Sequence, residues 1–405
     1  MRSVDDVRAE ILERIPVLAP IDLPLQEAYG CVLAEDVRAD ADMPSFSSSG
    51  MDGFAVRASD VREAGRDAAV TLRIAGRALV GRQPEATVGA GEAVAIATGA
   101  PVPAGADAIV PIEEARPDGD VVHVLRPAEE GRHVRPAGQD VKAGDVLVGT
   151  GRRIGPPELG LLAGSGRASF LVHPRARVVV LSTGDELVDP GKPIAYGQVR
   201  DANAYTLFGG LRDAGAVPFL TGIVRDDPDE LKEAVLGFAT RADCFISSGG
   251  VSVGERDVVK RAFFRRGDVE FYRVAMQPGM PQAFGFVEDT PYFGLPGNPV
   301  SVFVSFELFI RPAILKMMGR RDVVRPEVVA VLDDDIARRP DRLQFARVRV
   351  RRVEGRWHAA STGPSGSNLL ATVSRANGFA LIAAGEDSAR AGTDVRVMLF
   401  RALED

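Results

Sequence analysis

The sequence predicts a multidomain α/β plus β protein. Its centre is a doubly wound, mostly parallel sheet domain, accompanied by two small β-rich domains and a helical, extended linking domain. A length of 405 residues exceeds one ordinary core and predicts about two to four domains. Short apolar runs alternate with helix-like segments from about residue 174 to residue 318, the pattern of parallel strands joined by helices. Before and after this region, short apolar runs are separated by glycine and proline turns, which indicates β-domains.

Changes of pattern divide the chain into four predicted domains, which are residues 1–45 with 139–173, 46–138, 174–325 and 326–405. The first, linking domain begins with a helix, because Val4, Val7 and Ile11 recur at helical spacing among charged residues. The second is a small β-domain with runs such as 70–74. The last is predicted to be β-barrel-like and begins with the run 328–332.

Composition excludes several classes of protein. A net charge of −7 and a pI near 5.4 argue against a general nucleic-acid binder. No run approaches the roughly 20 apolar residues that span a bilayer, and residues 1–14 are charged rather than signal-like, so we expect a cytoplasmic protein without a membrane partner. The only cysteines, Cys31 and Cys244, lie in apolar segments and predict no structural zinc site.

The segment most informative about function is residues 247–254, Ser-Ser-Gly-Gly-Val-Ser-Val-Gly. It follows an apolar run, residues 242–246, and precedes a helix-like segment that begins near Arg256. Glycines let a backbone approach a ligand closely, and free N–H groups and serine hydroxyls offer hydrogen-bond donors to a phosphate or another oxyanion. The loop therefore predicts an anion site, although such a loop taken alone also serves simply to turn the chain tightly.

Two further loops are expected at the same edge of the sheet. The apolar run 178–181 leads into Ser182–Leu187, which contains Asp185 and Glu186. The run 218–224 ends at a loop that contains Asp226. Because ligands of such sheets bind at the carboxyl ends of the strands, these loops are predicted to converge on one crevice.

Three loops outside the α/β region carry polar residues beyond the needs of a turn. Residues 44–54 contain Asp52, whose alternative role is a turn that hydrogen-bonds its own backbone. Residues 98–107 begin at Thr98 and could also be simple turns. The segment 135–140 begins at Arg135 and ends at Asp140, which could equally form a solvated pair of little energetic weight.

Together these motifs resemble the molybdopterin molybdenumtransferase family, the MoeA-like proteins that include the E domain of gephyrin. The resemblance covers essentially the whole chain and is carried by residues 49–55, 98–107, 138–140, 183–187, 247–257 and 294–301. It implies a four-domain, elongated homodimer that inserts molybdenum from molybdate into adenylylated molybdopterin, with release of AMP. Two alternatives stay open: a molybdopterin adenylyltransferase, which the α/β domain alone suggests, and a non-catalytic dimeric scaffold of the same fold.

The resemblance also implies roles for particular residues. A divalent cation, usually Mg²⁺, would be held by Asp185, Glu186 and Asp257, since carboxylate oxygens are the hard ligands that it prefers. The carboxylates implied in catalysis are Asp52, Asp140, Glu186, Asp226 and Asp257. The residues implied in binding the pterin nucleotide or molybdate are Thr98, Arg135, Thr183, Ser247, Gly249, Gly250, Ser252, Gly254, Arg273, Gln277, Pro296, Asn298, Pro299, Arg347 and Ser367.

One segment departs from the family pattern, which usually has lysine where this chain has Gln277 and often also where it has Met280. Glutamine keeps hydrogen-bonding capacity but lacks the charge, and Arg273 is the nearby residue able to compensate. The resemblance further implies that Asp52 and Asp140 face the pterin site across a dimer interface, and that a molybdopterin adenylyltransferase is the partner that delivers the pterin.

Overall fold

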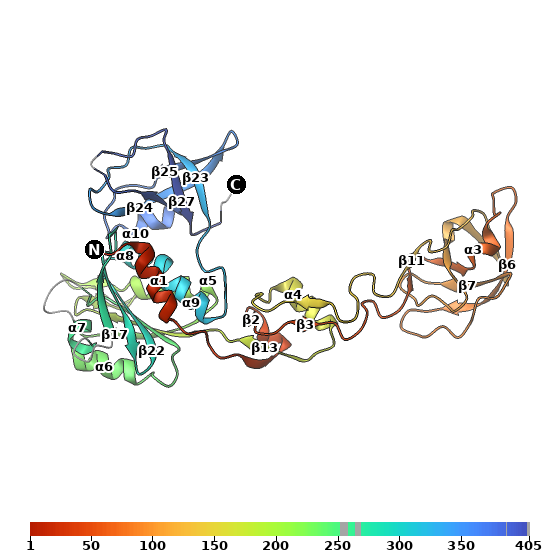
Figure 1. Ribbon diagram of the computed structural model, residues 1–405, viewed down its shortest axis with the longest axis horizontal. Coiled ribbons are helices and arrows are strands. Elements are labelled where there is room, and N and C mark those ends of the chain that lie inside the picture. Colours follow the sequence, from red (N-terminus) through yellow and green to blue (C-terminus); the bar gives the residue numbers. More distant parts are fainter. Residues whose placement is uncertain (252–257, 264–268, 386, 403–405) are drawn as a thin grey trace. The chain divides into compact units, whose positions relative to one another are not determined.

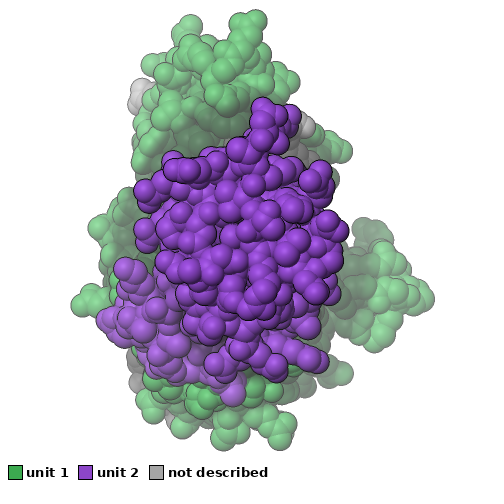
Figure 2. Space-filling model, turned by 90° about the vertical axis from the view of Figure 1, so that its right-hand side faces the viewer, with its two compact units in different colours: residues 1–34, 151–155, 169–405 green, residues 35–150, 156–168 purple. Residues whose placement is uncertain are grey.

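The computed structural model describes residues 1–251, 258–263, 269–385 and 387–402 (Figure 1). These fall into two compact units (Figure 2). Unit 1 comprises residues 1–34, 151–155 and 169–405, and unit 2 comprises residues 35–150 and 156–168. The predicted multidomain α/β plus β fold is confirmed. The predicted site residues Ser252, Gly254 and Asp257 lie outside the described residues.

A six-stranded mixed sheet organises unit 1, in the order β17-β14-β18-β22-β21-β19. Its strands are β14 (Arg177–Thr183), β17 (Val217–Val224), β18 (Cys244–Ser248), β19 (Val269–Arg273), β21 (Pro281–Val287) and β22 (Thr290–Leu295). The pairs β14–β17, β14–β18 and β18–β22 are parallel, and the remaining two are antiparallel. Glu288 and Asp289, both at positive φ, form the tight turn between β21 and β22 that produces the antiparallel edge.

Alternate residues of β14 point into two different cores, because successive side chains of a strand face opposite sides of the sheet. Val178 and Val180 belong to the core with α1 (Val4–Arg14), α5 (Asn203–Ala214), α8 (Pro299–Ser305), the π-helix η3 (Phe306–Ile310) and α9 (Arg311–Met317). Val179 and Leu181 belong to the core with α6 (Pro228–Leu236) and α7 (Val258–Phe263). Helices therefore cover both faces, as expected for a doubly wound sheet.

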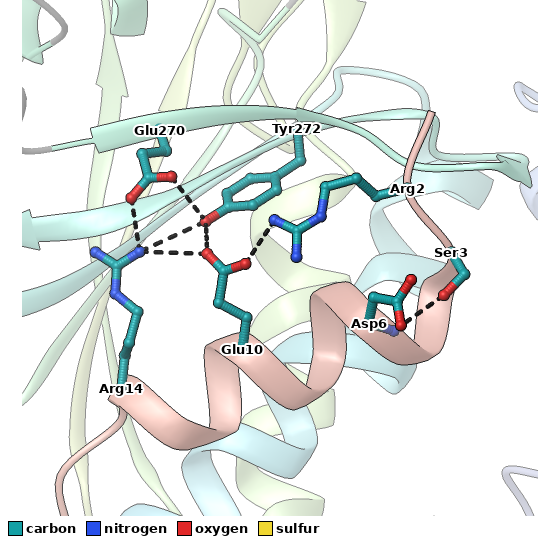
Figure 3. Close-up of polar contacts among 7 residues, drawn as sticks. All are labelled: Arg2, Ser3, Asp6, Glu10, Arg14, Glu270 and Tyr272. Carbon is teal, nitrogen blue, oxygen red and sulfur yellow. Dashed lines mark hydrogen bonds and ion pairs between the residues drawn. The ribbon is translucent and has the colours of Figure 1, made fainter.

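Local signals in the sequence set where the helices of this sheet begin and end. The side chain of Asp227 accepts hydrogen bonds from the N–H groups of Asp229 and Glu230, at 2.9 and 3.0 Å, and caps α6. Helix α5 ends at Gly215, whose φ of 94° suits glycine. At the start of α1, Ser3 Oγ accepts a 3.1 Å hydrogen bond from the N–H of Asp6 (Figure 3).

The C-terminal part of unit 1 is a β-sheet that closes on itself. Its strands are β20 (Met276–Gln277), β23 (Glu327–Leu332), β24 (Leu343–Val353), β25 (Arg356–Ser361), β26 (Gly378–Ile382) and β27 (Asp394–Leu399), with helix α10 (Leu370–Arg375) beside them. The order is β20-β24-β25-β23-β27-β26, and a further pairing of β24 with β26 closes the barrel. Gln277 pairs in register with Gln344, so β20 places the 276–281 loop beside the barrel.

Short elements complete unit 1. A three-stranded sheet joins β1 (Ile21–Pro24), β13 (Ser169–His173) and β2 (Val32–Leu33), with α2 (Leu25–Ala28) beside it, and β15 (Leu187–Val188) pairs with β16 (Val199–Arg200). Within the described residues of the chain, no helix has the length and apolar character needed to cross a membrane.

Unit 2 is built on a six-stranded sheet in the order β8-β5-β7-β6-β10-β9. Its strands are β5 (Gly53–Val56), β6 (Val70–Ala78), β7 (Glu92–Ile96), β8 (Ala108–Pro111), β9 (Ala115–Asp118) and β10 (Val121–Val124). Phe54, Leu72 and Val122 lie in its core. The smaller elements are β3 (Val37–Arg38), β4 (Ser48–Ser49), α3 (Ala58–Val61), η1 (Ile112–Glu114), β11 (Val134–Arg135), β12 (Val146–Val148) and α4 (Pro156–Gly164).

Candidate functional site

Loops at the carboxyl ends of the parallel strands of unit 1 enclose a cavity of about 470 Å³. Thr183, Gly184 and Glu186 line it after β14, and Asp226 lines it after β17. The glycine loop after β18 and the Pro296–Asn298 loop after β22 complete the wall. The structure thus brings together the loops that the sequence placed at one edge of the sheet.

The glycine loop packs so closely against its neighbours that side chains at Gly249 and Gly250 would clash with them. Gly249 and Gly250 have φ values of 94° and 68°, a region that side chains disfavour. A Cβ atom at Gly249 would lie 2.4 Å from the carbonyl oxygen of Thr183, and one at Gly250 would lie 2.5 Å from Cγ1 of Val258. The N–H of Gly249 donates to the carbonyl of Leu295 at 3.0 Å, so this residue brings the chain close to a ligand rather than supplying a free donor.

The neighbouring serines divide between the core and the cavity. Ser247 is fully buried, and its Oγ accepts a 2.6 Å hydrogen bond from the hydroxyl of Tyr292. Ser248 lines the cavity, with its Oγ 3.3 Å from Oγ of Ser182. Strand β18 continues to Ser248, so the two serines face opposite sides of the sheet. The apolar run in the sequence ends at residue 246, so Ser247 was predicted at the anion site and Ser248 was not.

Carboxylates gather on the other side of this cavity. Glu186 and Asp226 line it, and Oδ1 of Asp185 accepts a 3.4 Å hydrogen bond from the N–H of Asp226. Partial loss of hydration, followed by repulsion from Asp185 and Glu186, raises the pKa of Asp226 above its usual range. A bound cation or a protonated Asp226 would relieve this repulsion.

Among the described residues, no group of three or more His, Cys, Asp or Glu side chains is arranged to hold a metal ion. Mg²⁺, however, usually takes one or two protein carboxylates together with phosphate oxygens and water. The hard oxygen donors of Glu186 and Asp226 fit that mode of binding. Of the predicted metal ligands, Glu186 lines the cavity, Asp185 is exposed and contacts the N–H of Asp226 without lining the cavity, and Asp257 falls outside the described residues.

A second cavity of about 900 Å³ adjoins the first, since Pro281, Pro296 and Asn298 line both. Its other lining residues include Gln277, at the end of β20, and Ser367, on the loop before α10. Ser301 also lines it and is only 4% exposed, yet its hydroxyl has no hydrogen-bond partner among the described residues. The structure thus brings four predicted binding residues together at this cavity, namely Gln277, Ser367, Pro296 and Asn298. Ser301 belongs to the 294–301 motif but was not among the predicted binding residues.

Arg347 and Arg273 were both predicted to bind the ligand, but neither lines one of these two cavities. Arg347 is 4% exposed, and its guanidinium donates to Oγ1 of Thr372 at 3.0 Å, to the carbonyl of Ser365 at 3.4 Å and to the carbonyl of Pro364. Burial lowers the pKa of Arg347. It therefore holds the loop before α10 and does not line the cavity. Arg273 is exposed, with Nη2 4.0 Å from the sulfur of Met280, and does not line the cavity either.

The loop before α8 is held from two sides. Nδ2 of Asn203 donates a 2.8 Å hydrogen bond to the carbonyl of Gly297, which fixes the loop against the start of α5. Pro299 occupies the first turn of α8, where the absence of an N–H costs nothing. Asn298 precedes it without a side-chain capping bond, so its amide is available to a ligand of either cavity.

Four of the predicted site residues lie in unit 2. Oδ1 of Asp52 accepts a 2.7 Å hydrogen bond from the N–H of Thr98, so the carboxylate joins two loops rather than bonding its own backbone. Arg135 lies on β11, and its guanidinium Nε would be 3.6 Å from a Cβ at Gly50. Arg135 and Asp140 are both exposed, and the described contacts include no ion pair between them.

Models of known families match most of the chain. The MoeA N-terminal region (domain I and II) matches residues 2–166, a probable molybdopterin binding domain matches residues 179–316, and the MoeA C-terminal region (domain IV) matches residues 329–400. The chain is 42% identical over 403 residues to molybdopterin molybdenumtransferase 2 of Mycobacterium tuberculosis, covering 98% of this chain and 99% of that protein. It is 35% identical over 408 residues to the molybdopterin molybdenumtransferase of Haemophilus influenzae, covering 100% of both.

Solved structures agree with these matches. A crystal structure of a molybdopterin biosynthesis MoeA protein from Pyrococcus horikoshii is similar with a TM-score of 0.85 and 30% sequence identity, over 99% of each chain. A second structure of a MoeA protein from the same organism has a TM-score of 0.80 and 28% identity, over 99% of this chain and 100% of that chain.

Proposed function

The chain belongs to the molybdopterin molybdenumtransferase family, the MoeA proteins, and inserts molybdenum into molybdopterin; we propose that the pterin enters in adenylylated form, that molybdate supplies the metal, and that AMP is released. The observation that carries this proposal is the pair of adjoining cavities. One combines a bare glycine loop with carboxylates, and the other combines hydroxyl and amide groups with a cationic rim.

The first cavity suits the phosphates of the adenylylated pterin. Gly249 and Gly250 let a pyrophosphate approach the backbone closely, and the hydroxyls of Thr183 and Ser248 lie in the same wall. The predicted donors Ser252 and Gly254 would extend this loop. Asn298, which lines both cavities, would contact the ligand where the two meet.

The carboxylates suit the cleavage of a phosphoanhydride bond. Glu186 and Asp226 would hold Mg²⁺ through their oxygens, with Asp257 as a further predicted ligand. When bound, Mg²⁺ neutralises charge that develops on phosphate oxygens. Asp185 would orient the Asp226 loop through its 3.4 Å contact with the N–H of Asp226. The raised pKa of Asp226 supports this assignment, because repulsion among these carboxylates falls when a cation is present.

The second cavity suits molybdate, a tetrahedral dianion. Ser301 offers an unpartnered hydroxyl from the start of α8, and Ser367 offers another from the loop that Arg347 holds. Gln277 lines the same cavity with a neutral amide. Because Pro281, Pro296 and Asn298 are shared, molybdate in this cavity would lie next to a pterin bound at the glycine loop.

We propose further that the protein works as a cytoplasmic homodimer and receives its pterin from a molybdopterin adenylyltransferase. Asp52, Thr98, Arg135 and Asp140 of unit 2 would then face the cleft of a second copy. Support comes from Asp52 and Thr98, which are both exposed and are joined by a 2.7 Å hydrogen bond, an arrangement that prepares a carboxylate for a ligand outside unit 2.

The test is turnover by the purified protein. Incubation with adenylylated molybdopterin, Mg²⁺ and molybdate should release AMP, and Glu186→Gln should abolish this release while the fold is retained. Glu233→Gln, on the exposed face of helix α6 and outside the cavities, is the matched control and should keep full activity. Adenylylation of molybdopterin from MgATP would instead favour an adenylyltransferase, and absence of both reactions would favour a scaffold.

A further inference from the structure

The second cavity has three charged residues in its wall, Arg339, Asp341 and Arg342, all on the segment before β24. Two of them cancel each other. Nε and Nη2 of Arg342 each lie 2.7 Å from a different oxygen of Asp341, which is a two-pronged ion pair. The formal charge that the cavity wall presents to an anion therefore comes from Arg339.

Arg339 is placed to make such a contact. Its carbonyl accepts a 3.0 Å hydrogen bond from the N–H of Gly385, which fixes the backbone of the segment. Its guanidinium has no ion pair and no hydrogen bond among the described residues, and the residue is exposed at the cavity. A guanidinium that no carboxylate occupies can offer a planar pair of N–H groups to an oxyanion.

Two predicted arginine ligands, Arg347 and Arg273, do not line this cavity. Arg347 is buried, and its guanidinium donates hydrogen bonds to the carbonyls of Pro364 and Ser365. Gln277, at the end of β20, and Met280, on the loop that follows, carry no charge. A dianion in this cavity therefore meets neutral donors, including the hydroxyl of Ser301, the Asp341–Arg342 ion pair, and one cation that is unpaired among the described residues, Arg339.

We propose that Arg339 is the residue that provides the positive charge for molybdate binding in this chain. This assignment rests on the proposed function, because it takes molybdate as the anion of the second cavity. In this role the guanidinium of Arg339 binds two oxygens of the anion from the barrel side, Ser301 donates from α8 on the α/β side, and Ser367 donates from the loop before α10. Arg339 thus supplies the positive charge that Gln277 and Met280 do not provide.

Equilibrium dialysis with molybdate at low salt tests the assignment in the full-length protein. Arg339→Gln should raise the Kd for molybdate roughly tenfold, the loss expected for one charge-assisted contact. Arg339→Lys should retain part of the affinity, since lysine keeps the positive charge but lacks the paired N–H groups of the guanidinium. Arg338→Gln is the matched control, because it removes the same charge one residue away, outside the cavity wall, and should change the Kd less than about twofold.

The salt dependence of binding gives a second readout. Affinity of the wild type should fall as salt is added, and Arg339→Gln should show a weaker fall. Equal molybdate affinities for wild type and Arg339→Gln would overturn the assignment, while AMP release by the wild type would leave the proposed function standing. A wild type that neither binds molybdate nor releases AMP with it would instead overturn the proposed function.

Discussion

The hydroxyl of Tyr272 donates a 2.6 Å hydrogen bond to the carboxylate of Glu10, which joins the N-terminal helix α1 to the edge strand β19 (Figure 3). Arg2 and Arg14 pair with the same carboxylate at 2.5 and 3.6 Å, and Arg14 also pairs with Glu270 at 2.8 Å. This polar network, together with the buried apolar face of α1, holds the helix against the sheet that carries the site.

Removing the hydroxyl should cost stability without affecting chemistry. Tyr272→Phe should lower the free energy of unfolding by about 1.5 to 3 kcal/mol at pH 7, the range for a hydrogen bond to a charged group. Urea unfolding measures this change. Tyr272 is 5% exposed and lines neither cavity, so AMP release by the folded variant should match the wild type. Unchanged stability would show that Glu10 is satisfied by the arginines alone.

The same network predicts a dependence on pH. The hydrogen bond from Tyr272, and then contacts with Arg2, lower the pKa of Glu10. Its contribution is therefore present above the ordinary carboxyl value of 4.5 and is lost as the pH falls through the lower folded value. Glu10→Gln should thus destabilise the protein at pH 7 and progressively less below pH 4.5. Glu13→Gln, on the exposed side of the same helix, is the control and should show neither effect.

A buried ion pair should matter more than an exposed one. Glu307 lies in η3 with its side chain 3% exposed and accepts hydrogen bonds from Arg325 at 2.8 and 3.1 Å. Glu307→Gln should lower the free energy of unfolding by about 3 kcal/mol, because it leaves Arg325 without its counter-charge. Asp394→Asn removes the negative charge from the ion pair with Arg356, in which the Asp394 and Arg356 side chains are 60% and 68% exposed. This change should alter the free energy of unfolding by less than about 1 kcal/mol. Similar losses in the two variants would contradict this ranking.

The close approach at the glycine loop gives a fourth prediction. Gly249 and Gly222 share a φ of 94°, but a Cβ at Gly222 meets no described atom within 4 Å, whereas one at Gly249 meets the carbonyl of Thr183. Gly222→Ala should cost about 1 kcal/mol of stability for the backbone conformation alone. Gly249→Ala should cost more and also abolish AMP release. If both variants keep full turnover, the loop does not approach the ligand.

Adding a positive charge to the cavity that Arg339 lines gives a fifth prediction. Gln277→Lys should strengthen molybdate binding by about 0.5 to 2 kcal/mol, since Gln277 lines the second cavity. The gain should shrink with added salt. It should also rescue Arg339→Gln if both positions act on the same anion. Dialysis at two salt concentrations measures these effects, and equal affinities for Gln277→Lys and wild type at both would place residue 277 outside the anion's reach.

Much of the sheet and its loops was predictable, because a buried parallel strand reads as a continuous apolar run and the polar loop after it stands out. Thr183, Glu186, Asp226 and Gly249 were found in this way and line one cavity. The antiparallel edge was not predicted, since the turn at Glu288 and Asp289 carries no glycine to mark the hairpin.

It was harder to predict which way a side chain points than to predict which loop carries it. Strand β18 is two residues longer than its apolar run, so Ser248 lines the cavity and Ser247 is buried on the other side of the sheet. Arg347 looked like an anion ligand, but its burial turns the guanidinium toward backbone carbonyls. Arg339 carries no local signal, because only the closure of the barrel and the pairing of β20 with β24 bring its segment to the cavity.

The most direct test of the central claim is the dependence of AMP release on molybdate. Purified protein is loaded with adenylylated molybdopterin and Mg²⁺, molybdate is then added, and AMP and pterin-bound molybdenum are measured together. The two cavities predict that AMP appears in step with molybdenum bound to the pterin, and that Glu186→Gln yields neither. AMP release that is the same with and without molybdate, and leaves the pterin free of molybdenum, would contradict the account.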